Sequence, residues 1–175
     1  MRYWLIGSGS EKTRWSSWRK NKKISIGFNV KKSLRNLDKS QIESYLRQVS
    51  RDSRANVDAC FDFTHSMAVG DVVVIREGLR EIVGVCRISG NYVYDKSLKD
   101  YRNVRKVEWV SIERVRNQDR TLLPQQTLLN FTDKENRTWL RNYVDESIDF
   151  NQRIVWKIDP PEPTNYTSTR TNQLE

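Results

Sequence analysis

Hydrophobic and polar positions alternate most regularly between Met67 and Val110. Turn signals, a Gly-Asp pair at 70–71 and Gly78, divide this stretch into short runs rich in β-branched residues. The predicted strand segments are Val72–Ile75, Ile82–Asp95 and Val104–Val110. Three strand signals in a row, separated by turns, predict an antiparallel meander. The rest of the chain is expected to pack around that sheet.

The register of the meander assigns residues to faces, because side chains alternate along a strand. If Ile82–Asp95 is one strand, Tyr92 and Tyr94 share a face with Cys86, and Asp95 points to the other face. On the next segment, Arg105 and Trp109 share a face, so the arginine could border a base pocket or form a structural cation-π pair.

The flanking segments predict two more strands and several helices. Arg2–Ile6 is a first strand that ends in the turn Gly-Ser-Gly-Ser, and Ile24–Phe28 is a second. Ser40 and Glu43 form a capping box that starts a helix. Further predictions are a helix over Arg54–Met67, a loop over 121–131, a capping box at Thr132 and Glu135, and a last strand over Ile154–Ile158. We expect one domain over residues 1–158 and a polar linker or tail over 159–175.

Charge is concentrated in one part of the chain. The sequence has 31 Lys and Arg against 22 Asp and Glu, a net charge of +9. The segment from Lys12 to Leu37 contains no acidic residue, and its basic residues are Lys12, Arg14, Arg19, Lys20, Lys22, Lys23, Lys31, Lys32 and Arg35. This local positive field favours a polyanionic partner such as nucleic acid.

Trp15 and Trp18 lie within the basic segment, and two interpretations stay open. Lys and Arg could neutralise phosphates while an indole offers a flat face to an unstacked base. Alternatively, the two tryptophans are three residues apart on one helix face and pack into the core. We expect the cluster as a whole to contact phosphate.

Catalytic and metal-binding patterns are poorly represented. His65 is the single histidine, and the carboxylates lack the spacing that holds Mg²⁺ for phosphodiester cleavage. Cys60 and Cys86 have no metal-binding spacing and are expected to be reduced core residues of a cytoplasmic protein. We therefore predict no catalytic residues, no metal, no cofactor and no membrane segment.

The order of several motifs resembles a known family. These are WLIGSGSE followed by Trp15, then ISIGF, FDF, MAVGDVVVIREG, IVGVCRISGNYVYD and YRNVRKVEW. Over about Tyr3 to Ile112 they resemble EVE-type, PUA-like domains, which are related to YTH domains, and most of all those at the N-terminus of McrB-type modification-dependent restriction proteins. The chain departs from that pattern at Asn103, where a histidine is expected, and at Phe28, where a tryptophan is usual.

The resemblance implies an α+β fold, a curved and mostly antiparallel β-barrel flanked by helices. It also implies an aromatic cage for a modified base, with candidates Trp15, Trp18, Tyr92, Tyr94 and Trp109. The implied hydrogen-bonding candidates are Gly7, Ser8, Ser10 and Asp95. The phosphate-binding candidates are Lys12, Arg14, Arg19, Lys20, Lys22, Lys23, Arg102 and Arg105.

The predicted function is non-catalytic recognition of a modified base in DNA, flipped out of the duplex, with methylated adenine first and methylated cytosine second. Through the resemblance, we expect the chain to be fused to or to work with a GTPase and nuclease restriction assembly. The alternatives are an RNA-binding PUA-like or YTH-like module, in which 2′-hydroxyl contacts would matter, and a small metal-dependent nuclease.

Overall fold

The computed structural model describes residues 1–9, 12–49, 54–116, 122–132 and 138–156. The helices are α1 (Lys12–Asn21), α2 (Lys39–Val49), α3 (Arg54–Phe61), the π-helical turn η1 (Asp62–Ser66) and α4 (Thr138–Trp156). The strands are β1 (Tyr3–Gly7), β2 (Lys23–Ile26), β3 (Val72–Glu77), β4 (Glu81–Ile88), β5 (Val93–Tyr94), β6 (Asn103–Ser111), β7 (Val115–Arg116) and β8 (Leu128–Asn130).

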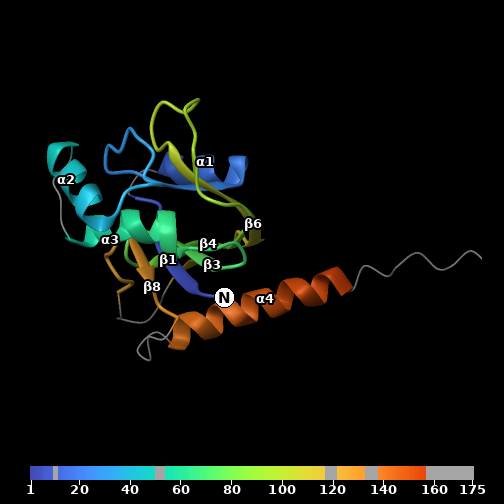
Figure 1. Cartoon of the computed structure of the whole chain (residues 1–175). Coiled ribbons are helices and arrows are strands. Elements are labelled where there is room, and N and C mark those ends of the chain that lie inside the picture. The colour runs from blue at the N-terminus through green and yellow to red at the C-terminus, as the bar shows by residue number, and fades with distance from the viewer. Residues whose placement is uncertain (10–11, 50–53, 117–121, 133–137, 157–175) are drawn as a thin grey trace, which may run out of the picture.

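One curled sheet contains all the described strands. Its order is β2-β6-β4-β3-β1-β8, with β5 paired to β6 and β7 paired to β4. The β1–β3 pair is parallel and every other described pair is antiparallel. Register shifts in the β3–β4 and β4–β6 pairs bend the strands. The α+β class with a curved, mostly antiparallel sheet is confirmed, and the sheet forms a half-barrel (Figure 1).

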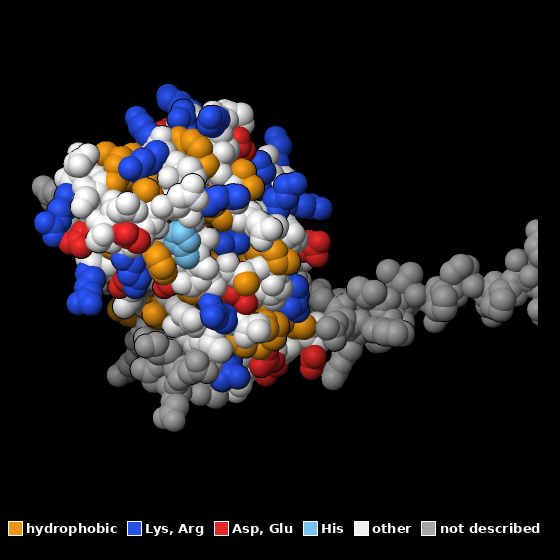
Figure 2. Space-filling model, viewed as in Figure 1, with side chains coloured by type: hydrophobic (Ala, Val, Ile, Leu, Met, Phe, Trp, Pro, Cys, Tyr) orange, Lys and Arg blue, Asp and Glu red, His pale blue; other side chains and the backbone are white. Residues whose placement is uncertain are grey.

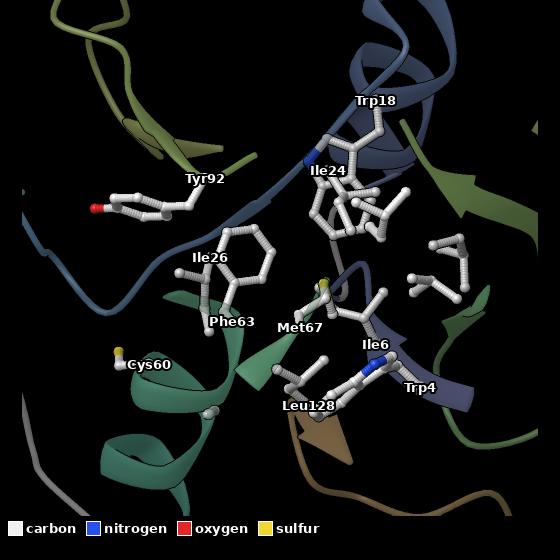
Figure 3. Close-up of a cluster of buried hydrophobic side chains, with 14 of the residues drawn as sticks. Trp4, Ile6, Trp18, Ile24, Ile26, Cys60, Phe63, Met67, Tyr92 and Leu128 are labelled. Atoms are coloured by element: carbon white, nitrogen blue, oxygen red, sulfur yellow. The ribbon is translucent and has the colours of Figure 1, made fainter. Parts of the chain in front are cut away.

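Both faces of the sheet are buried, and this explains the continuous apolar run in β3. Val73 and Ile75 face one core, which Trp4 of β1 and residues of α1, α2 and α3 also fill. Val72 and Val74 face a second core, which contains Leu140 and Val144 of α4. Figure 1 shows α1, α2 and α3 on one side of the strands and α4 on the other. Figure 3 shows part of the first core, in which Trp4 of β1, Phe63 of η1 and Met67, which follows η1, come together.

The prediction of one long strand over Ile82–Asp95 is wrong. Strand β4 ends at Ile88, and β5 is a separate strand that pairs with β6 through Val93 and Val104. The intervening turn contains Gly90, whose neighbour is the Lys106 side chain of β6. Both β4 and β5 run antiparallel to β6, so the chain keeps its direction along β6 across this interruption, and Tyr92 is buried in the same core as Cys86.

The helix predicted from Ser40 is confirmed, but its cap is different. Helix α2 begins at Lys39, and Asp38 precedes it. The Gln41 amide donates to Asp38 Oδ1 at 2.8 Å, and the Asp38 amide donates to Gln41 Oε1 at 3.0 Å. These two bonds are a capping box that starts two residues earlier than predicted. Since Ser40 lies inside the helix, its hydroxyl donates to Asp38 Oδ1 instead, at 2.7 Å.

The predictions for the C-terminal part of the chain differ most from the structure. Residues 154–156, predicted as a strand, belong to α4, and residues 157–158 lie outside the described residues. Strand β8 lies in the segment predicted to be a loop, where Leu5 of β1 pairs with Leu129. The capping box at Thr132 and Glu135 and the tail at 159–175 extend beyond the described residues, so they stay predictions.

Cys60 and Cys86 are free and buried, as predicted. Burial raises the pKa of the Cys60 thiol to about 12 and raises the pKa of Cys86 as well, so neither sulfur is a reactive thiolate at neutral pH. Within the described part of the chain, no helix combines the length and the apolar character needed to cross a membrane.

Candidate functional site

Helix α1 presents a polar stripe toward an open hollow. Arg14, Ser17, Trp18 and Asn21 follow helical spacing and all line this hollow. The turn before α1 brings the chain close to Arg14, because a Cβ on Gly9 would lie 2.8 Å from Arg14 Nη1. Gly9 also has a φ of +81°, a conformation that glycine adopts without steric cost.

The hollow beside α1, called the helix pocket, has a volume of about 400 Å³. Its other lining residues are Lys23, Ser25, Asp95, Ser97, Leu98, Asp100, Tyr101 and Val104. Ser25 and Val104 are register partners of β2 and β6, so the sheet forms the floor. A volume of this size is within the range of roughly 300–1,000 Å³ that is typical of small-molecule sites, and it can hold a nucleobase.

A second hollow, called the loop pocket, lies next to the helix pocket and has a volume of about 410 Å³. Its lining residues are Gly27, Phe28, Asn29, Val30, Lys31, Lys99, Asp100, Tyr101 and Arg102. Lys31, Lys99 and Arg102 bring three positive charges to it against one carboxylate, Asp100. Asp100 and Tyr101 line both pockets, so the two hollows are neighbours.

Arg102 has a fixed position at the wall of the loop pocket. Its Nε donates to the Leu98 carbonyl at 2.7 Å, and its Nη1 donates to the Tyr94 hydroxyl at 3.3 Å. The Tyr94 hydroxyl in turn donates to the Lys31 carbonyl. These bonds join the two loops that form the pocket. Figure 2 shows Lys and Arg side chains along the upper edge of the molecule, where Figure 1 shows these loops.

The cage candidates do not surround one hollow. Trp15 is only 8% exposed, and its ring lies edge-on to Trp109 with ring centroids 5.0 Å apart. Neither of these residues lines either pocket. The structure therefore contradicts an open cage position for Trp15 and agrees with the alternative in which Trp15 and Trp18 pack into the core. The physical reason is that Trp15 lies on the inner face of α1, where the missing side chain of Gly84 leaves room for its ring.

Trp18 is the cage candidate that reaches a pocket. Little of it is accessible, because the residue is 4% exposed and packs in the first core near Ile24 (Figure 3). Its Nε1 donates to Ser25 Oγ at 2.9 Å. Tyr92 is buried, and its hydroxyl accepts a bond of 2.9 Å from the Leu34 amide and donates to Asn103. Asn103 is thus an internal hydrogen-bonding residue.

The candidates for hydrogen bonding to a base also lie in different places. The Gly7 amide donates to Thr127 O, and the Ser8 amide and hydroxyl both donate to Arg76 O, so these groups are used within the fold. Ser10 lies outside the described residues. Asp95 does line the helix pocket. The Ser97 hydroxyl and, to a smaller extent, Lys23 Nζ at 3.1 Å lower the pKa of the Asp95 carboxyl.

The basic candidates divide into three groups. Arg14, Lys23 and Arg102 line the pockets. Exposed side chains at the end of α1 and the start of β2 form the second group, which consists of Arg19, Lys20 and Lys22. The structure describes Lys12 only through its helical backbone, and its side chain lies outside the described residues.

Arg105 forms the third group, and its predicted phosphate contact is wrong. It is 3% exposed, and its Nε and Nη2 donate to the carbonyls of Phe63 and Thr64 at 2.7 and 3.1 Å. These carbonyls lie near the end of η1, and the last carbonyls of a helix need partners from outside it. Burial lowers the pKa of the Arg105 guanidinium to about 10, so it keeps its charge at neutral pH.

The sequence interpretation missed Tyr101, Lys99 and Phe28. Tyr101 has no alternating pattern around it, but the resemblance pointed toward Phe28 as a departure from a usual tryptophan. The non-glycine residues with positive φ in the described chain are Lys22, Phe28, Asn29 and Tyr101. Three of them line the loop pocket, and such uncommon backbone conformations cluster at functional sites.

His65 is exposed, and its Nε2 lies 3.0 Å from the Leu37 carbonyl oxygen. Among the residues that the structure describes, no three His, Cys, Asp or Glu side chains are grouped as metal ligands.

Together, these features define an α+β half-barrel protein with two adjoining hollows at the loop before β6, one beside α1 and the other beside the segment after β2. The chain belongs to the family described as Domain of unknown function (DUF8426), whose profile matches residues 4–132. No curated protein matches it. Among solved structures, it is similar to the YTH domain of the Zygosaccharomyces rouxii MRB1 protein in complex with N6-methyladenosine RNA. That likeness has a TM-score of 0.44 and 16% identity, and covers 82% of this chain and 86% of that chain.

Proposed function

We propose that this chain is a non-catalytic nucleic-acid-binding module that holds one unpaired or flipped base at the helix and loop pockets. The observation that carries the proposal is the pairing of the two hollows. The helix pocket combines apolar walls at Trp18, Leu98 and Val104 with polar groups, and the loop pocket beside it has a net positive charge. A base attached to a phosphodiester needs this combination.

The chemistry of the helix pocket suits recognition of a base edge. Ser25, Ser97 and Asn21 bring hydroxyl and amide groups to its wall, and Asp95 brings a carboxylate that accepts hydrogen bonds. Ring nitrogens and exocyclic groups of a base can bond to such a set. A methyl group on the base would lie against the apolar wall, and its burial contributes about 0.8 kcal/mol, roughly fourfold in Kd.

The finer features of the proposal are a modified base in DNA, with methylated adenine before methylated cytosine, and a targeting role in a McrB-type restriction assembly with a GTPase and a nuclease. The resemblance of motifs such as ISIGF and YRNVRKVEW to EVE-type domains supports these features. Extruding a base from a duplex costs a few kcal/mol, and stacking of roughly 1–3 kcal/mol per base with phosphate contacts can offset it.

The first experiment is a binding panel with purified full chain. Short fluorescent oligonucleotides differ only in one central base (adenine, N6-methyladenine, cytosine or 5-methylcytosine), in sugar, and in strandedness, and fluorescence anisotropy measures Kd at matched salt. We expect modified DNA to bind most tightly. Equal affinity for modified and unmodified strands would contradict base reading, and a preference for single-stranded RNA would select the RNA-binding alternative.

The second experiment tests the charged wall. Lys31→Ala with Lys99→Ala should weaken binding of modified and unmodified strands alike, and should lower the slope of log K against log salt by about 0.7 to 0.9 for each lost phosphate contact. The matched control is Arg54→Ala with Arg80→Ala, which removes the same charge from exposed positions that line neither pocket. An equal effect of both pairs would show only a general charge effect.

The nuclease alternative has its own readout. Cleavage of a labelled strand by the purified chain that requires added Mg²⁺ or Mn²⁺ and stops with a chelator would replace the binding proposal with a catalytic one.

A further inference from the structure

The Tyr101 ring occupies a narrow slot between the two pockets. One edge of the ring lies against Gly27, where a Cβ would be 2.5 Å from Tyr101 Cε1 and 3.0 Å from Cδ1. The Arg14 guanidinium carbon lies 4.1 Å from the ring centroid. A flat aromatic group thus has a glycine backbone at its edge and a guanidinium over its face. Single-stranded bases adopt the same kind of stacking on arginine.

The contacts that hold the Tyr101 ring are few and open to solvent. Tyr101 is 36% exposed, whereas Trp15 and Trp18 are both below 10%. Its hydroxyl accepts a hydrogen bond from Arg14 Nη2, the same side chain that covers the ring. The residue has a φ of 53°, which a bulky residue rarely adopts. Rotating this side chain outward breaks the hydrogen bond from Arg14 and the contact of its guanidinium with the ring, and leaves the core intact.

Removing the ring would join the two pockets. Tyr101 and Asp100 form the boundary that both share, and the pockets on either side measure about 400 and 410 Å³. The resulting trough would have Gly27 at one edge and Arg14 over it, with the cationic Lys31, Lys99 and Arg102 at one end. A base in the slot would place its phosphates toward that end.

We propose that the slot covered by Arg14 and bordered at its edge by Gly27 is the stacking position for the bound nucleobase, and that Tyr101 occupies it in the free chain. This inference rests on the proposed function and adds where the base stacks and which residue competes with it. Tyr101 lowers the fraction of molecules that can bind, so the apparent Kd is weaker than the intrinsic Kd by that fraction.

The test uses the full chain and a short fluorescent single-stranded DNA with one N6-methyladenine, at fixed low salt. Tyr101→Gly suits the backbone φ and removes the ring, so we expect affinity to rise by about 3- to 10-fold. Tyr101→Phe keeps the ring and should stay within about twofold of wild type. In the Tyr101→Gly background, Gly27→Ala puts a methyl group into the edge of the slot and should cancel the gain.

The outcomes separate the two proposals. If wild type binds with a preference for the modified base but Tyr101→Gly weakens binding, the ring is a permanent wall, and the proposed competition is overturned. Unchanged affinity in Tyr101→Gly overturns it too, since the ring then lies outside the path of the base. If wild type binds none of the strands in the panel, the proposed function is contradicted, and so is the proposal for the slot.

Discussion

Two glycine–aromatic pairs in this molecule have similar geometry and different surroundings. A Cβ on Gly84 would lie 2.6 Å from Trp15, and a Cβ on Gly27 would lie 2.5 Å from Tyr101. Trp15 is covered by Trp109 and the rest of the first core, whereas Tyr101 is covered by a guanidinium and reaches solvent. The covering group, and not the local motif, therefore decides whether such a pair stabilises the fold or is available to a ligand.

Two arginines repeat the contrast. Arg105 is buried and donates to carbonyls of η1. Arg14 is half-buried, its Nε has no hydrogen-bond partner among the described residues, and its guanidinium lies over Tyr101 beside the helix pocket. A cation with its donors committed to backbone carbonyls cannot bind phosphate. A cation that covers an exposed ring can rearrange when a ligand enters.

Trp15→Ala should have the largest effect on stability. Loss of a buried indole with the cavity left beside Trp109 lowers the free energy of unfolding by about 3–5 kcal/mol. Tyr101→Ala should change it by less than about 1 kcal/mol, because surface substitutions have small effects. Urea denaturation followed by circular dichroism measures both. Similar losses in the two variants would remove the distinction between the interior pair and the open pair.

Arg105→Ala should follow, with a loss of about 2–4 kcal/mol, because it leaves a cavity and unpaired carbonyls at Phe63 and Thr64. Arg14→Ala should lose less than about 1 kcal/mol of stability and instead change nucleic-acid binding. The same denaturation experiment, with Arg105→Lys as an intermediate variant, checks this order. A stable Arg105→Ala protein would mean that the η1 carbonyls find other partners.

Gly84→Ala should cost about 1–3 kcal/mol, because the new methyl group meets the Trp15 ring and the Ser111 carbonyl, which the core holds in place. Gly27→Ala meets the Tyr101 ring, which can move into solvent, and should cost less than about 1 kcal/mol. Thermal unfolding of both single variants gives the comparison. An equal loss in both would show that Tyr101 is held as firmly as Trp15.

The smallest effect concerns pH in the open region. The Ser97 hydroxyl and Lys23 lower the pKa of the Asp95 carboxyl from its ordinary value of 3.8. Its contribution to stability is therefore fully present above that value and is lost as the pH falls through the lower pKa of the folded state. Asp95→Asn should remove this part of the acid dependence, by less than about 1 kcal/mol. Unfolding curves of the wild type and of Asp95→Asn between neutral pH and about pH 3 test the prediction. An equal loss of stability in the two proteins as the pH falls would contradict it.

Part of the site could be predicted from the sequence. The basic segment and the resemblance pointed to α1 and the following strand, and Arg14, Trp18, Lys23 and Asp95 do meet at the helix pocket. Tyr101 could not be found this way, because its importance depends on Gly27 and Arg14, which are distant in the sequence. Trp15 was misplaced for the opposite reason. The spacing of Trp15 and Trp18 defines a shared helix face but not which part of that face meets the core.

The sequence by itself determined the local elements: the apolar runs of β3 and β4, the amphipathic α2 and the basic segment around α1. These depend on periodicity and on residues close to one another along the chain. Only the tertiary structure decided that β1 lies parallel to β3, that Arg105 is enclosed, and that Gly27, Arg14 and Tyr101 meet. Burial and ring contacts arise from segments that meet only after the sheet has curled. A local sequence pattern therefore does not predict which side chain will cover another.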